Sequence, residues 1–233
     1  MTFNKELFKE NLQGIAVSDK QLELLDSFGA LLTEKNKSVN LTSITDPDGI
    51  AVKHFADSIS LLKADIPQGA KVLDLGCGAG FPGIPLLIMR PDIKLTLLDS
   101  TGKKLDFVSE ALDALSLEAE VLHGRAEELG QNPDYREKYD IVVSRAVAYL
   151  NTLCELALPF VKTGGTFIPM KGASAAEESK SAYTAIKTLG GSLEKSIDFT
   201  LTDGSRSLLI IKKLSPTPPK YPRHGSQISK KPL

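Results

Sequence analysis

The stretch that decides the fold is VLDLGCGAGFPGIPLLIMRP, residues 72–91. It joins a short apolar run to a second apolar segment through three glycines at alternate positions: Gly76, Gly78 and Gly80. Glycines in such a loop let the backbone turn tightly and approach a ligand without an obstructing Cβ. Pro82 and Pro85 suit the first turn of a helix, where a missing N–H does little harm. The stretch therefore predicts a strand, a glycine loop and a helix, with a ligand beyond the carboxyl end of the strand.

The spacing of the glycines separates two kinds of ligand. A dinucleotide-binding loop reads G-x-G-x-x-G and would need glycine at position 81, where this chain has Phe81. The pattern from Asp74 to Gly80 is D-x-G-x-G-x-G, which is typical of S-adenosylmethionine (AdoMet) methyltransferases. The next apolar run ends in Asp99, where an acid can accept both hydroxyls of a ribose. We therefore predict a nucleoside cofactor rather than a purely structural turn.

Apolar runs and helical stretches alternate from residue 71 onward. This alternation predicts parallel βαβ units with helices on both faces of a sheet. A turn around residues 202–205 joins two further runs, which predicts an antiparallel hairpin at the end of the sheet. We expect an α/β fold with a mostly parallel seven-stranded sheet. The expected strands are Val72–Leu75, Leu95–Leu98, Ala119–Leu122, Ile141–Val143, Gly165–Met170, Leu193–Leu201 and Ser207–Lys213, with helices at Lys103–Leu115 and Leu150–Phe160.

The segment before the sheet reads as helical. Ser18 and Gln21 fit a capping box, and leucines and Phe28 follow at helical spacing. A second helix follows a turn at residues 46–49. Its expected buried stripe is Ala51, Phe55, Ile59 and Leu62, and its other face shows Lys53, His54, Asp57 and Ser58. We expect three parts: an N-terminal helical extension (1–66), a cofactor-binding domain (67–214) and a basic C-terminal tail (215–233).

Composition excludes several classes of protein. The 233 residues are 42% hydrophobic and 24% charged, which excludes wholesale disorder. No apolar run approaches the roughly 18 residues that a membrane span needs, and the N-terminus lacks the apolar core of a secretory signal. Two cysteines, Cys77 and Cys154, cannot make a disulfide framework or a zinc cage. We expect a cytoplasmic protein without a membrane partner and without a metal.

Positive charge gathers at the C-terminal end. Residues 171–233 carry 11 Lys and Arg against 5 Asp and Glu, although the net charge of the whole chain is −1. From residue 212 onward the chain has no acid and six basic side chains: Lys212, Lys213, Lys220, Arg223, Lys230 and Lys231. A terminal block of this kind is often a nucleic-acid-binding arm, and just as often a solubilising tail.

Longer motifs resemble the RsmG (GidB) family, bacterial methyltransferases that act on N-7 of a guanosine in small-subunit rRNA. The matching segments follow one another over nearly the whole chain: NLTSITDP (40–47), KHFADS (53–58), DLGCGAGFPGIPL (74–86), LLDSTGKK (97–104), GRAEEL (124–129), VSRAV (143–147), MKG (170–172) and the terminal YPR…KKPL. The tail departs from the family at His224 and residues 227–229, where relatives more often carry a basic or proline-containing stretch.

The resemblance implies a fold, a cofactor and a partner. The fold is a Rossmann-like AdoMet-dependent methyltransferase domain with a small helical N-terminal extension. The cofactor is S-adenosyl-L-methionine, and the partner is 16S rRNA or the small ribosomal subunit, including an assembly intermediate. The enzyme is expected to be a monomer. The resemblance also implies cofactor contacts at Gly76, Phe81, Ala126, Glu127 and Arg145.

Several polar side chains keep more than one interpretation at this stage. Asp74 can bind the methionine amino group of the cofactor or cap the glycine loop, and the two roles can coexist. Arg145 can hold the cofactor carboxylate, hold an RNA phosphate, or form a salt bridge at the end of the sheet. His54 and Asp57 share a helix face and can reach the site, reach the RNA or pair with each other. Lys171 can line the RNA entrance, and His123 is expected to be structural.

The absence of other motifs narrows the range of possible methyl acceptors. Guanine N-7 has a free lone pair and no proton to lose, so no general base is obligatory and alignment is the main task. An exocyclic amine acceptor favours a D/N-P-P-Y motif where this chain has VSRAV, and a carbon acceptor needs a thiolate. We interpret Cys77 and Cys154 as packing residues. The alternatives that stay open are an AdoMet methyltransferase with another acceptor, a nicotinamide oxidoreductase, and a non-catalytic rRNA-binding assembly factor.

Overall fold

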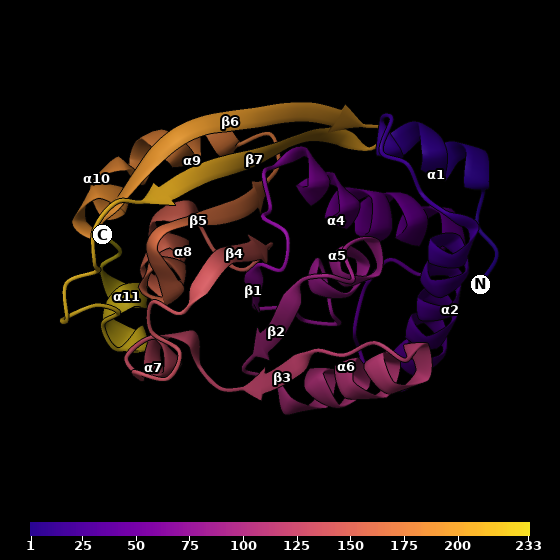
Figure 1. The fold of residues 1–233 in the computed structure, drawn as a ribbon, viewed down its shortest axis with the longest axis horizontal. Helices are drawn as coiled ribbons and strands as arrows, with labels where there is room; N and C mark the ends of the chain where they lie inside the picture. Colours follow the sequence, from indigo (N-terminus) through magenta and orange to yellow (C-terminus); the bar gives the residue numbers. More distant parts are fainter.

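The computed structural model describes residues 1–233 and contains one seven-stranded sheet between two layers of helices (Figure 1). The strand order is β3-β2-β1-β4-β5-β7-β6; β1 to β5 run parallel, and β7 is antiparallel to both of its neighbours. This arrangement confirms the α/β prediction and the terminal hairpin. The strands are β1 (Lys71–Leu75), β2 (Lys94–Asp99), β3 (Glu120–His123), β4 (Tyr139–Arg145), β5 (Val161–Lys171), β6 (Gly191–Leu201) and β7 (Gly204–Lys213).

Alternate strand residues feed two hydrophobic cores. On β4, Ile141 and Val143 point into a cluster of 40 buried residues, whereas Val142 points into a second cluster of 21. The larger core is covered by α1 (Lys5–Leu12), α2 (Asp19–Asn36), a helical segment over residues 47–63, α5 (Gly83–Met89) and α6 (Gly102–Leu115). The smaller core lies under α8 (Leu150–Ala157), η3 (Leu158–Phe160), α9 (Ala175–Ser181) and α10 (Tyr183–Thr188). The N-terminal helices thus share a core with the sheet.

The N-terminal helices begin where the sequence predicts. The Ser18 side chain accepts from the Gln21 N–H, and the Gln21 side chain accepts from the Ser18 N–H, so the capping box is present. The second helical segment is continuous but irregular: α3 (Pro47–Gly49), the π-helical η1 (Ile50–Ala56), α4 (Asp57–Ile59) and the 3₁₀ turn η2 (Ser60–Lys63). None of the helices is both long and apolar enough to span a membrane.

The polar face predicted for this second segment is wrong in part. Ala51, Phe55 and Ile59 are buried as expected, but Asp57 and Ser58 are buried as well. The reason is tertiary, because the end of β4 and the start of β7 bring arginine side chains over Asp57.

The six basic side chains from residue 212 onward do not all face solvent. Lys213 is fully buried and its Nζ donates to Leu158 O (2.6 Å) and Thr217 Oγ1 (2.7 Å). Burial lowers the pKa of Lys213 to about 8. Arg223 forms an ion pair with the buried Glu155. The last helix, α11 (Gly225–Lys230), packs beside α8, so the tail is folded onto the domain (Figure 1).

Candidate functional site

A cavity of about 290 Å³ lies at the carboxyl ends of β1, β2 and β3. It contains five of the residues predicted to hold a cofactor, namely Gly76, Gly78, Asp99, Ala126 and Glu127. Asp74, Phe81 and Arg145 are not part of its lining. The remaining wall residues are Leu75, Leu98, Ser100, Lys104, Gly124, Arg125, Ala146, Val147 and Leu156.

The glycine loop needs glycine for two different reasons. Gly76, Gly78 and Gly80 all have positive φ, at 75°, 56° and 90°. A Cβ on Gly76 would lie 2.5 Å from Val147 Cγ2, whereas one on Gly78 would meet nothing within 4 Å. The first glycine thus allows a close approach of two loops, and the second leaves open space beside the cavity. The N–H groups of Gly76 and Cys77 donate to Leu98 O (2.8 and 3.0 Å), which fixes the loop against β2.

Asp99 is oriented by the backbone of the loops around it. Its Oδ2 accepts from the Gly78 N–H (2.9 Å) and its Oδ1 accepts from the Thr101 N–H (2.8 Å). Each carboxylate oxygen accepts only one of these bonds, so both retain acceptor capacity toward the cavity. A carboxylate held in this way suits the paired hydroxyls of a ribose.

Replacing Asp99 with alanine is expected to weaken AdoMet binding by about 1.5–3 kcal/mol, because two hydroxyls lose a charged acceptor. Titration calorimetry measures this change directly. Asp92→Ala is the matched control, because Asp92 also accepts a loop N–H at 2.9 Å, from Gly69, at the far end of β2. Equal AdoMet affinity in Asp99→Ala and the wild type would remove Asp99 from the site.

Asp74 lies beneath the loop rather than in the cavity. Its Oδ2 accepts from the Gly83 N–H (2.7 Å) at the start of α5, and its Oδ1 has no partner. The side chain is fully buried, and burial raises the pKa of Asp74 to about 7. Of the two interpretations left open by the sequence, capping is the one that these contacts show.

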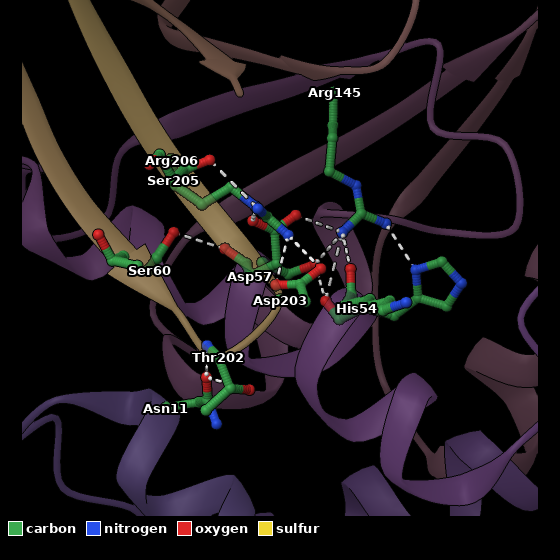
Figure 2. Close-up of polar contacts among 12 residues, drawn as sticks. Asn11, His54, Asp57, Ser60, Arg145, Thr202, Asp203, Ser205 and Arg206 are labelled. Atoms are coloured by element: carbon green, nitrogen blue, oxygen red, sulfur yellow. Dashed lines mark hydrogen bonds and ion pairs between the residues drawn. The ribbon is translucent and has the colours of Figure 1, made fainter. Parts of the chain in front are cut away.

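Arg145 belongs to a polar cluster that joins three distant parts of the chain (Figure 2). Its Nη1 donates to Asp57 Oδ2 (2.9 Å) and Lys53 O (3.1 Å). The other Asp57 oxygen accepts from Arg206 Nε (2.8 Å), and Arg206 Nη2 also binds both oxygens of Asp203. The salt bridge at the end of the sheet is therefore formed. His54 and Asp57 do not pair with each other, because both bind Arg145.

Phe81 lies under this cluster and outside the cofactor cavity. Its ring stacks on His54 with centroids 4.6 Å apart, and the Arg145 guanidinium lies 5.2 Å from its centroid. The Phe81 ring also contacts Phe28 of α2, with ring centroids 5.2 Å apart. The phenyl group therefore joins the N-terminal helices to the glycine loop.

His54 is held as a neutral imidazole. Arg145 can only donate, so Nδ1 of His54 accepts from Arg145 Nη2 (3.3 Å) and Nε2 carries the proton toward Thr42 Oγ1 (2.8 Å). Burial, together with the positive charge of Arg145, lowers the pKa of His54 to about 4. An imidazole with this pKa is unsuited to carrying a proton at neutral pH.

His54 is expected to make the protein less stable in acid. Between its native pKa of about 4 and its ordinary value of 6.5, the unfolded chain binds a proton that the folded chain does not. The stability contributed by His54 is therefore complete above pH 6.5 and is lost as the pH falls to about 4. The free energy of unfolding should fall less between pH 7 and pH 4.5 in His54→Gln than in the wild type, by about 2 kcal/mol. Urea unfolding of both proteins at the two pH values measures this difference. Titrations common to both proteins, including that of Asp74, cancel in this difference; an equal acid loss in both would contradict the prediction.

A second cavity, of about 270 Å³, lies at the ends of β4 and β5 and the start of β7. Lys171 lines it, and Lys171 Nζ donates to Ala148 O (2.7 Å) and Glu178 Oε2 (2.7 Å). The sequence interpretation missed Arg206 and Glu178, because neither lies in a recognisable motif. The residues that line this second cavity are Asp57, Arg145, Ala146, Met170, Lys171, Gly172, Glu178 and Arg206.

The remaining candidates have structural surroundings. His123 is exposed and its Nε2 lies 3.1 Å from Ser100 O. Cys77 and Cys154 are both buried, and burial raises the pKa of each thiol. Buried thiols of this kind are poor nucleophiles, in agreement with their interpretation as packing residues.

Comparison with solved structures reproduces the fold. TrmN from Thermus thermophilus superposes with a TM-score of 0.54 at 20% identity, covering 68% of this chain and 48% of that one. A SAM dependent methyltransferase from Aquifex aeolicus superposes with a TM-score of 0.54 at 18% identity, covering 77% and 97%. At these identities the similarity shows the architecture alone.

Comparison with known sequences is closer. The model of the GidB family, described as rRNA small subunit methyltransferase G, matches residues 21–208. Ribosomal RNA small subunit methyltransferase G of Pelotomaculum thermopropionicum is 46% identical over 239 aligned positions, covering 100% of both chains. The protein of the same name from Alkaliphilus oremlandii is 45% identical over 235 positions, covering 98% of both. The chain belongs to the GidB family of rRNA small subunit methyltransferase G.

Proposed function

We propose that this protein is an AdoMet-dependent methyltransferase that modifies N-7 of a guanosine in 16S rRNA. The single observation that carries the proposal is the cavity at the ends of β1, β2 and β3, which collects the glycine loop, Asp99 and Glu127 in a chain of this family. The two close relatives described above are named for action on small-subunit rRNA.

The cavity fits the cofactor by the chemistry of its walls. Gly76 and Gly78 give a backbone surface without side chains, and Asp99 is oriented to accept from ribose hydroxyls. Ala126 and Glu127 lie at the start of α7 (Ala126–Leu129), where Glu127 can accept from an adenine amino group. Bound AdoMet supplies an activated methyl group on a sulfonium. The proposed task of these residues is to bind it and to orient that methyl group.

The reaction needs alignment rather than proton transfer. Guanine N-7 has a free lone pair, and it would accept the methyl group supplied by AdoMet held at Gly76, Gly78, Asp99 and Glu127 without release of a proton. This agrees with a site where His54 is neutral and both thiols are buried. Holding the two reactants in line can supply much of the rate enhancement.

We further propose that the enzyme works as a monomer in the cytoplasm, on the small ribosomal subunit or its assembly intermediate. In this proposal the N-terminal extension (1–66) and the tail (215–233) frame the methyltransferase domain (67–214).

The test is mass-spectrometric mapping of methyl groups on small-subunit rRNA, incubated with AdoMet with and without the enzyme. We expect one added methyl group on N-7 of one guanosine. A methyl group at another atom or on another acceptor would contradict the proposal. AdoMet binding without any methyl incorporation would favour an assembly factor, and binding of NAD in place of AdoMet would favour an oxidoreductase.

The exposed lysines of the tail are expected to bind RNA phosphates. Lys220, Lys230 and Lys231 are exposed, whereas Arg223 is occupied by Glu155 and is left unchanged. Changing the three lysines to glutamine should weaken rRNA binding. The slope of log K against the logarithm of the salt concentration should become shallower by about 2, because each single-strand phosphate contact contributes roughly 0.7.

AdoMet affinity should stay constant in this triple variant. The matched control changes three exposed N-terminal lysines (Lys5, Lys9 and Lys20) to glutamine and should leave the slope unchanged. An unchanged salt slope in the tail variant would mean that the RNA binds elsewhere, around Lys53, Lys103 and Lys104.

A further inference from the structure

The two cavities lie on either side of the point where the strand order reverses. The 290 Å³ cavity is above β1, β2 and β3, and the 270 Å³ cavity is above β4, β5 and β7. Ala146, directly after β4, lines both of them and has a left-handed backbone with φ 56°. Ligands of such sheets bind at this switch point. Ala146 is therefore part of the wall of both cavities.

The charges in the second cavity are already paired. Arg145 and Arg206 both bind Asp57, and Arg206 also binds Asp203 (Figure 2). Lys171 binds Glu178. A phosphate would have to compete with a carboxylate for each of these cations. A neutral ligand with both donors and acceptors can instead add to the existing bonds without breaking them.

Asp57 retains the acceptor capacity that such a ligand needs. Its two oxygens each accept from one arginine, so each keeps room for a further hydrogen bond. Arg145 donates through Nη1 and Nη2, and none of its hydrogen bonds uses Nε. The cavity thus places a free cationic donor beside a carboxylate. Guanine presents the complementary edge, with the N1–H and N2–H donors beside the O6 acceptor.

We propose that this second cavity is the subsite for the acceptor guanine, turned out of the RNA, and that Asp57 accepts hydrogen bonds from its N1–H and N2–H groups. The proposal rests on the proposed function. Enzymes that act on a base commonly hold it outside the stack and read its Watson–Crick edge. Adenine lacks the N1–H donor, so this arrangement distinguishes guanine from adenine.

Gly172 provides a steric test that removes no existing contact. It lines the cavity, its φ is not positive, and a Cβ added to it would meet only Ser205 O, at 4.0 Å. Gly172→Leu should therefore fold normally and fill the space proposed for the base. We expect methyl transfer to rRNA to fall roughly 100-fold, because the acceptor is displaced from the methyl group. Gly172→Ala should give a smaller loss, and AdoMet affinity and Tm should stay unchanged in both.

A substrate test addresses Asp57 itself. Reconstituted rRNA carrying inosine at the methylated position lacks only the N2 amino group. The wild type should use this substrate about tenfold less well than the guanosine form, because a hydrogen bond to a charged group is lost. In Asp57→Asn the preference should shrink toward equality. Both substrates are assayed with the same enzyme preparation, so the ratio of their methylation rates does not depend on how much of the variant is folded.

The outcomes separate the two levels of the proposal. If the wild type transfers no methyl group to guanosine N-7, the proposed function fails and the subsite fails with it. If the wild type is active and Gly172→Leu is equally active, the base lies elsewhere and the subsite alone is overturned. If Gly172→Leu is impaired while Asp57→Asn keeps the full preference for guanosine, the base lies in the cavity but Asp57 does not recognise its N1–H and N2–H groups.

Discussion

Replacing Arg223 with alanine is expected to lower the free energy of unfolding by about 3–5 kcal/mol, because it leaves a buried carboxylate without its partner. Glu155 has no exposed surface and accepts from three groups of Arg223: the backbone N–H (2.9 Å), Nε (2.8 Å) and Nη2 (2.6 Å). Two of these bonds disappear with the guanidinium. Urea unfolding of the two proteins at pH 7 measures the difference.

Two further variants identify the cause of this loss. Lys231→Ala, an exposed cation in the same tail, should change the stability by less than about 0.5 kcal/mol. The double variant Arg223→Met, Glu155→Leu should recover much of the loss, because it removes the buried charge together with its partner. A loss below about 1 kcal/mol in Arg223→Ala would show that water reaches Glu155 once the arginine is gone.

Asp57→Ala is expected to destabilise the protein by a similar amount, about 3–5 kcal/mol. The Asp57 side chain is 7% exposed and lies between two guanidinium groups. After the substitution Arg206 keeps its ion pair with Asp203, but Arg145 has no other carboxylate partner. The same carboxylate ties the helical segment 47–63 to the β6–β7 hairpin, whose turn also reaches α1 through the Thr202 N–H and Asn11 Oδ1 (2.8 Å). Thermal and urea unfolding should both report the loss.

Asp203→Ala is the matched control for Asp57→Ala. Asp203 also binds Arg206, but it is 22% exposed and contacts one arginine instead of two. Its removal should cost about 1 kcal/mol or less, as for other partly exposed ion pairs. Equal losses in the two variants would mean that the shared carboxylate has no special role in holding the segments together.

The sequence by itself determined those features that depend on neighbours along the chain. The apolar runs of the strands, the capping box at Ser18 and the glycine loop each depend on residues a few positions apart, and Asp99 ends the next apolar run along the chain. The structure confirms the α/β fold and the terminal hairpin, and it brings Gly76, Gly78, Asp99, Ala126 and Glu127 into one cavity. That grouping is predictable because the carboxyl ends of parallel strands share one edge of the sheet.

Only the tertiary structure decided which charges are buried and paired. Asp57 is 88 residues from Arg145 and 149 from Arg206, and Arg223 is 68 from Glu155. A local pattern reports whether a side chain is polar, and a polar side chain on an amphipathic helix is expected to face water. Its partner depends on the order in which the strands join the sheet, and the hairpin places β7 beside β5. For that reason the sequence placed Asp57 on the polar face of its helix and counted Arg223 only as a basic side chain, although each is paired in the fold with a charge from a distant segment.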